Sequence, residues 1–126
     1  MPMQTATAQL AANRRILEAL GVPRIPTVEE AVILTGSTVG TYLIEEINKQ
    51  AFEVAQADAD AIRAAGEIQR YANDVADRIA KHEYTDGTWV GQAAGRVVEA
   101  TNKRREALRT LAQLTYAASK AVVDFS

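Results

Sequence analysis

The residue types that could bind a metal gather at one point of the chain, where His82, Glu83 and Asp86 stand close together. A zinc site needs three or four nitrogen, sulfur or carboxylate ligands around one point. His82 is the only histidine, and the chain has no cysteine. A histidine near the end of a helix can instead interact favourably with the helix dipole. We therefore interpret this cluster as a helix C-terminus, and we expect no metal site and no cofactor.

Catalytic constellations are also lacking in the sequence. A set of Ser, His and Asp would have to use the single histidine, and no glycine-rich phosphate-binding loop occurs. Asp58 and Asp60 fall on different faces of a helix, so they do not form a pair of catalytic carboxylates. The lack of cysteine excludes thiol nucleophiles and disulfides. We predict a protein that is not an enzyme.

A basic cluster occurs in the last third of the chain, and two acidic residues, Glu99 and Glu106, interrupt it. Its members are Arg96, Lys103, Arg104, Arg105 and Arg109. The net charge of the whole chain is −2, and residues 27–83 hold eleven acidic and five basic residues. Nucleic-acid binding favours a more basic chain with aromatic or glycine-rich elements nearby. We interpret the cluster as a solvated face that pairs with the acidic segment, and we expect no nucleic-acid partner.

The spacing of apolar residues predicts an all-α fold, a long antiparallel helical hairpin preceded by short N-terminal helices. A first helix is expected over 5–20, because Gly21 and Pro23 follow as stop signals. Residues 22–26 (VPRIP) are expected to form an extended strap, because each proline restricts the residue before it. We divide the chain into an N-terminal arm, 1–40, and the hairpin, 41–126.

A second short helix is expected to begin at Thr27, because Thr27 and Glu30 have the spacing of a capping box. Residues 31–44 are uncharged, but this stretch is too short to span a bilayer, so we expect no membrane span. Gly36 and Ser37 are expected to interrupt the helix, with Ser37 capping the next one. The alternative use of Gly36 and Gly40 is a close helix crossing in an assembly.

Two long segments show apolar residues at alternating steps of three and four, the spacing of a coiled-coil seam. In the first segment the stripe is Ile44, Ile47, Ala51, Val54, Ala61, Ala65, Ile68, Ala72, Val75 and Ile79. In the second it is Val90, Ala94, Val97, Thr101, Arg104, Leu108, Leu111, Thr115, Ala118, Val122 and Phe125. Asp58 falls on the first stripe and breaks it.

The tip of the hairpin is predicted at residues 84–91, with Gly87 in the turn. Trp89 is expected to cover the open end of the hairpin, and Gly91 to let the helices approach. A reversal near residue 87 would make opposing residue numbers add to about 174, as two antiparallel helices require. This register places Asp58 near Tyr116, and lets Arg104 reach Asp74 or Glu67.

An interaction surface is expected on the outside of the hairpin, because its seams consist largely of alanine and bury little area. Five larger apolar residues lie off the mutual seam. They are Leu43 and the four expected contact residues, Phe52, Ile62, Val98 and Leu114. Exposed apolar patches usually mark interaction sites. We predict that the chain forms a homo- or hetero-oligomer through these residues, unless the N-terminal helix folds back and covers them.

The stretch Trp89-Val90-Gly91, with Ala93 and Ala94 and the amphipathic segment that follows, resembles the WxG family of type VII (ESX) secretion. The resemblance covers residues 44–125. It implies a small helical hairpin that is exported or assembled with a partner hairpin, and export without a cleaved signal peptide. Tyr116 is followed four residues later by Lys120 rather than by the acidic residue of the family's export signal. Export would then depend on a partner that carries this signal.

A second hypothesis assigns the chain to a phage virion, as a structural subunit of a head–tail or other assembly. In that case residues 1–40 would be an arm that docks on a neighbouring subunit. The two hypotheses predict different locations, outside the cell or within a virus particle, and the sequence leaves both open.

Overall fold

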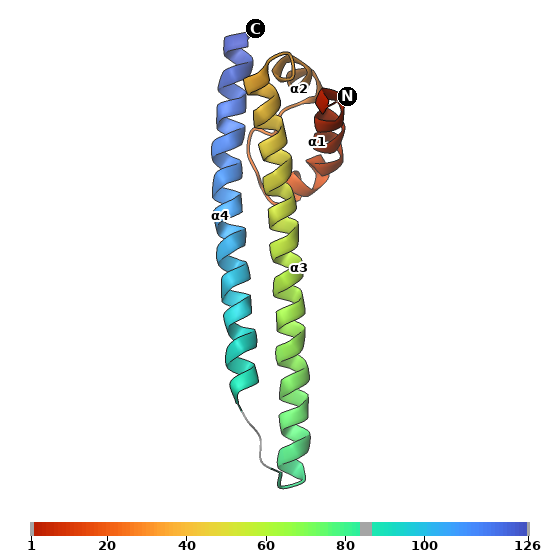
Figure 1. Ribbon diagram of the computed structural model, residues 1–126, viewed down its shortest axis with the longest axis vertical. Helices are drawn as coiled ribbons and strands as arrows, with labels where there is room; N and C mark the ends of the chain where they lie inside the picture. The colour runs from red at the N-terminus through yellow and green to blue at the C-terminus, as the bar shows by residue number, and fades with distance from the viewer. Residues whose placement is uncertain (1, 84–86, 126) are drawn as a thin grey trace. The chain divides into compact units, whose positions relative to one another are not determined.

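The computed structural model describes residues 2–83 and 87–125, with side chains from residue 6 onward, and every regular element among them is an α-helix (Figure 1). The helices are α1 (Pro2–Ala19), α2 (Val28–Leu34), α3 (Thr38–Ala80) and α4 (Thr88–Phe125). The two long helices, α3 and α4, pair as an antiparallel hairpin, and two shorter helices precede them. The predicted all-α fold is therefore confirmed.

The described chain divides into two compact units, and both long helices pass through both units. The first unit comprises Met1–Val54 and Glu106–Ser126, and the second comprises Ala55–Arg105. In the first unit α1 and α2 accompany the beginning of α3 and the end of α4. In the second unit only the remaining parts of α3 and α4 pair with each other.

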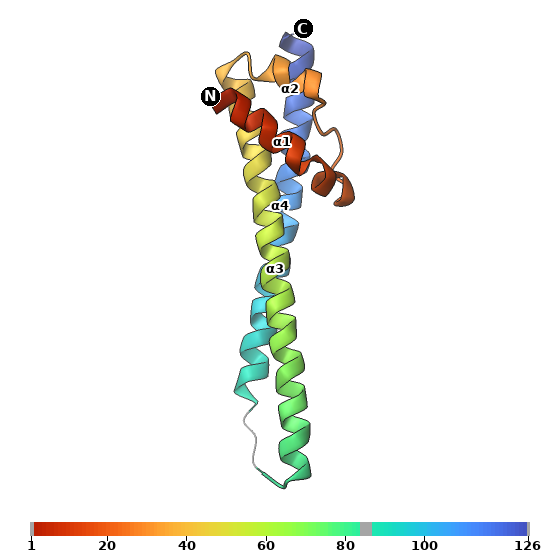
Figure 2. The ribbon, with the colours of Figure 1, turned by 90° about the vertical axis from the view of Figure 1, so that its right-hand side faces the viewer.

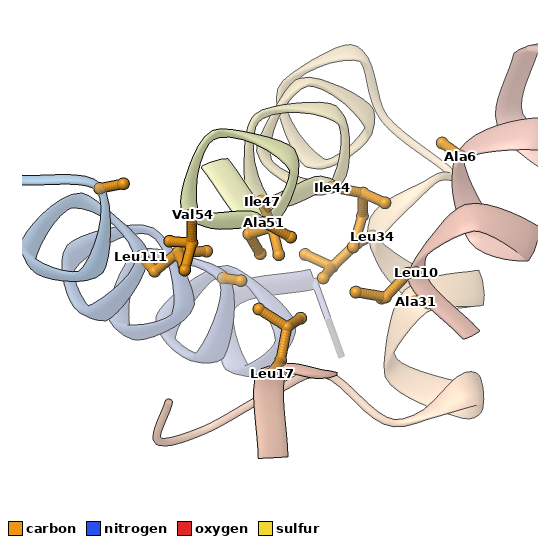
Figure 3. Close-up of a cluster of buried hydrophobic side chains, with 12 residues drawn as sticks. Ala6, Leu10, Leu17, Ala31, Leu34, Ile44, Ile47, Ala51, Val54 and Leu111 are labelled. Atoms are coloured by element: carbon orange, nitrogen blue, oxygen red, sulfur yellow. The ribbon is translucent and has the colours of Figure 1, made fainter. Parts of the chain in front are cut away.

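The first unit has a conventional apolar core to which all four helices contribute (Figure 3). Leu10 and Leu17 of α1 are completely buried together with Ile44 and Ile47 of α3 and with Leu111 of α4. Figure 2 shows α1 lying obliquely across α3. Because a fully buried Leu or Ile contributes about 1.5–3 kcal/mol, these side chains account for much of the stability of this unit.

The end of α1 is fixed by a glycine in the left-handed region. Gly21 has φ of 76°, and its N–H donates to the carbonyl of Glu18 at 3.0 Å. The N–H of Val22 donates to the carbonyl of Leu17 at 3.1 Å, which completes a Schellman motif. The predicted stop signal at Gly21 is confirmed.

The junction between α2 and α3 agrees with the sequence prediction. Thr27 and Glu30 form the reciprocal capping box at the start of α2. Ser37 then accepts a hydrogen bond from the N–H of Gly40 at 2.9 Å and caps α3. Gly40 serves a close approach within the chain, because a Cβ at this position would lie 1.9 Å from the carbonyl oxygen of Leu34.

In the second unit the seam consists of alanines at every seventh position. Ala57 and Ala64 of α3, and Ala93 and Ala100 of α4, are buried. The seam predicted from the sequence was displaced by one position at several places. Four of its predicted members are exposed: Ala65, Ala72, Ala94 and Thr101. Alanine at one seam position per heptad gives little side-chain area to bury, so this unit lacks the large apolar core of the first unit.

The end of α3 is formed by a histidine rather than by a glycine. His82 has φ of 60°, and its N–H donates to the carbonyl of Ile79 at 3.0 Å. The N–H of Glu83 donates to the carbonyl of Arg78 at 2.8 Å. This is again a Schellman motif, so the prediction that His82 lies at a helix C-terminus is confirmed.

Candidate interaction surface

Two ion pairs link α3 to α4 in the second unit. The Nε of Arg104 donates to Oδ1 of Asp58 at 2.7 Å, and Arg96 pairs with Glu67. The predicted register was therefore wrong. Arg104 contacts neither Asp74 nor Glu67, and opposing residue numbers add to about 162 rather than 174.

The register differs because the prediction placed the chain reversal at Gly87. The helix already ends at Ala80, and its terminal turn is made at His82. At the observed register Asp74 is level with Thr88, so the last turns of α3 extend beyond the beginning of α4 (Figure 1). Asp74 pairs within its own helix, with Arg78 at 2.8 Å.

A charged groove of about 270 Å³ lies between the two helices of the second unit. Ala64 and Ala100 form its floor, and its walls are Asp60, Arg63, Glu67, Arg96, Glu99 and Lys103. Each wall residue has an oppositely charged neighbour: Arg63 pairs with Asp60 at 3.6 Å, and Lys103 pairs with Glu99 at 3.4 Å. Because three carboxylates balance three cations, the groove favours neither an anionic nor a cationic ligand.

The basic cluster of α4 is thus divided among acidic partners on both helices. Arg96 and Arg104 bind α3, while Lys103 and Arg109 pair with Glu99 and Glu106 one turn away. This arrangement agrees with our interpretation of the cluster as a face that pairs with the acidic segment. Arg105 is exposed.

The Trp-x-Gly stretch lies in the first turn of α4, where its tryptophan is in contact with solvent. Trp89 is 63% exposed, so the prediction that it covers the end of the hairpin was wrong. A Cβ on Gly91 would meet nothing within 4 Å, so Gly91 is not needed for a close helix approach. Gly87 is exposed just before α4, and the preceding residues 84–86, including Asp86, lie outside the described residues.

Three of the four apolar residues predicted for the outer surface of the hairpin are exposed. Phe52 in the first unit is 64% exposed, and Ile62 and Val98 in the second unit are 74% and 59% exposed. Leu114 differs, because it packs against the core of the first unit. It therefore does not belong to an open interaction surface.

A buried asparagine on α3, which the sequence prediction missed, attaches α1 to the hairpin. The side-chain amide of Asn48 donates to the carbonyl of Ala6 at 3.0 Å. Its Oδ1 accepts a hydrogen bond from the amide of Asn13 at 3.1 Å. The signal available in the sequence was a polar residue directly after the seam position Ile47, which is buried in the structure.

Membrane-spanning helices and groups of metal-ligand side chains are absent from the part of the chain that the structure describes. None of its helices is both long enough and apolar enough to cross a bilayer. Within residues 2–83 and 87–125, no three side chains of His, Asp or Glu converge as metal ligands. Comparison with protein-family models, curated proteins and solved structures finds no match to this chain.

Proposed function

We propose that this protein is a non-enzymatic helical interaction module, which acts by pairing its hairpin with another helical chain. The observation that supports this proposal most strongly is the exposure of Phe52, Ile62 and Val98 on the long helices. A solitary exposed leucine or valine is ordinary on a protein surface. Three large side chains are each more than half exposed on the long helices, and two of them, Ile62 and Val98, lie in the unit whose seam is alanine. A partner explains this exposure better than chance does.

Within this class we propose a hairpin of the WxG type. The paired long helices and the Trp-x-Gly stretch at the start of α4 support this choice. The exposed ring of Trp89 is then a contact for the partner, because tryptophan is enriched at binding hot spots. A subunit of a virion remains the second candidate, and the size of the assembly separates the two.

Sedimentation velocity of the purified full-length chain tests the interaction module. We expect association that depends on concentration and that weakens when Phe52, Ile62 and Val98 are replaced together by Gln. The matched control is Val123→Gln, which alters a 74% exposed apolar residue near the end of α4. Equal association of the triple variant and the wild type would reject these three side chains as contacts of the partner.

The mass of the assembly then distinguishes the candidate functions. A dimer, or a one-to-one complex with a chain encoded nearby, supports the WxG-type hairpin. A large ring or filament supports the virion subunit. The neighbouring genes provide an independent test, since a secretion ATPase gene favours the first candidate and capsid or tail genes favour the second.

A further inference from the structure

The contact face of α1 forms one regular stripe. Ala6, Leu10 and Leu17 are buried, and Asn13 donates to Asn48, so the contact positions follow steps of four, three and four. The opposite face of α1, including Arg15 and Ile16, is exposed. A helix with this pattern fits its groove in only one register, because the asparagine pair must meet.

The connection from α1 to α2 contains a backbone conformation that its sequence disfavours. Val22 and Ile25 each precede a proline, which favours extended backbone at both. Pro23 and Pro26 themselves favour the same geometry. Arg24 between them nevertheless has φ of 58°, a left-handed conformation that is disfavoured for a residue with a Cβ. The chain accepts this conformation so that α1 can turn back onto its own hairpin.

We propose that α1 is exchanged between two copies of this chain, so that each copy fills the groove of the other and residues 23–26 open into an extended hinge. This inference rests on the proposed function, and it names a second copy as one partner. Short hinges under strain favour such exchange, because the strain is released when the hinge opens. The hydrogen bonds of Asn48 with Ala6 and Asn13, which join α1 to its groove, are recovered between the chains. The contacts of the opened hinge, such as Arg14 with the carbonyl of Pro26 and Arg24 with the ring of Tyr116, are given up.

Two substitutions of Arg24 act on the hinge in opposite directions. Arg24→Gly accepts the left-handed conformation and stabilises the closed chain. Arg24→Pro fixes φ near −65° and excludes the closed geometry. Both variants remove the same cation–π contact with the ring of Tyr116, 5.4 Å away, so each is the matched control for the other.

Sedimentation equilibrium of the full-length variants measures the effect. We expect the dimer of Arg24→Pro to be tighter than that of Arg24→Gly by at least about a hundredfold, since two hinges change and the left-handed penalty alone contributes about tenfold at each. The wild type should lie between them. A folded Arg24→Pro variant that stays monomeric, or equal dissociation constants for both variants, would overturn the exchange.

A mixing experiment tests the exchange with the native hinge, in case Arg24→Pro does not fold. Because the chain has no cysteine, Asn13→Cys in one copy and Asn48→Cys in another give an unambiguous pair. Refolding the two variants together and oxidising them should yield a disulfide-linked heterodimer. Arg15→Cys, on the exposed face of α1, should yield none with Asn48→Cys.

The outcomes separate this inference from the proposed function. A dimer that forms no disulfide between Asn13→Cys and Asn48→Cys overturns the exchange and leaves association through Phe52, Ile62 and Val98 in place. A chain that is monomeric at all concentrations and finds no partner overturns both. A heterodimer whose yield falls when Arg24→Gly is added to both copies supports the exchange.

Discussion

Gly40 in the first turns of α3 lies directly against the backbone of Leu34 at the end of α2. A Cβ on Gly40 would stand 1.9 Å from the carbonyl oxygen of Leu34 and 2.6 Å from its carbonyl carbon. These atoms belong to backbone and cannot rotate away. The turn between α2 and α3 therefore requires glycine at this position for reasons of space.

Replacing Gly40 by Ala should destabilise the first unit by about 1–3 kcal/mol or more, because α2 must shift to admit the methyl group. Gly95→Ala is the control, since a Cβ on Gly95 meets nothing within 4 Å. That substitution should stabilise the exposed helix by up to about 1 kcal/mol. Urea denaturation followed by circular dichroism measures both. Equal effects of the two substitutions would mean that α2 does not pack as described.

The left-handed histidine at the end of α3 offers a stabilising substitution. His82→Gly should increase the free energy of unfolding by about 1 kcal/mol, because glycine adopts φ of 60° without a steric penalty. His82→Ala keeps the Cβ and should bring no such gain. Thermal melting compares the two variants, and a gain shared by alanine would point to the imidazole rather than the backbone.

The buried amide of Asn48 should be sensitive to substitution. Asn48→Ala leaves the carbonyl of Ala6 and the amide of Asn13 without their partner, which should cost about 1–3 kcal/mol. Thr115→Val is the control at another buried polar site, because the Thr115 hydroxyl donates only to carbonyls of its own helix, at 2.9 and 3.2 Å. Hydrogen exchange of the α1 amides should accelerate in the first variant and stay unchanged in the second.

The ion pair between Asp58 and Arg104 should contribute little stability. Both side chains are more than 40% exposed, so a double-mutant cycle should give a coupling of about 0.2–1 kcal/mol that declines with added salt. The main effect of the pair is to favour the register in which α3 and α4 meet. Exchanging the two residues, with Arg at 58 and Asp at 104, should restore the melting temperature that either single reversal lowers. Failure of this exchange to restore stability would contradict the observed register.

The exposed position of Trp89 predicts a small structural role. Trp89→Ala should change the free energy of unfolding by less than about 0.5 kcal/mol, as substitutions at exposed sites usually do. Its fluorescence should resemble that of a tryptophan in water and shift to the blue when a partner binds. A large loss of stability would show that the ring is covered in the free chain.

Much of the helical organisation follows from local chemistry and was therefore predicted from the sequence. The capping box of Thr27 and Glu30, the stop at Gly21 and the cap at Ser37 each depend on residues within a few positions of one another. The apolar residues of the first unit, such as Ile44, Ile47 and Leu111, were identified for a similar reason. Large side chains make the helical period unambiguous.

The tertiary structure alone decided how the two long helices meet. Along the second unit the sequence offers alanines at neighbouring positions, such as Ala64 with Ala65 and Ala93 with Ala94. Because these side chains differ so little in buried area, the apolar pattern could not choose the seam between them. The register depended on where the chain reverses. The helix end at His82 was predicted, but Gly87 indicated a later reversal than the one that the left-handed His82 begins.

The position of α1 could likewise not be predicted from the sequence. Its stripe at Ala6, Leu10 and Leu17 is compatible with a free arm, with a cover for its own hairpin and with a cover for a neighbour. Asn48 selects the groove and Arg24 bends the strap toward it, and both effects depend on contacts between residues far apart in the chain. Local propensity determined that these helices form, and long-range packing determined which surfaces they bury.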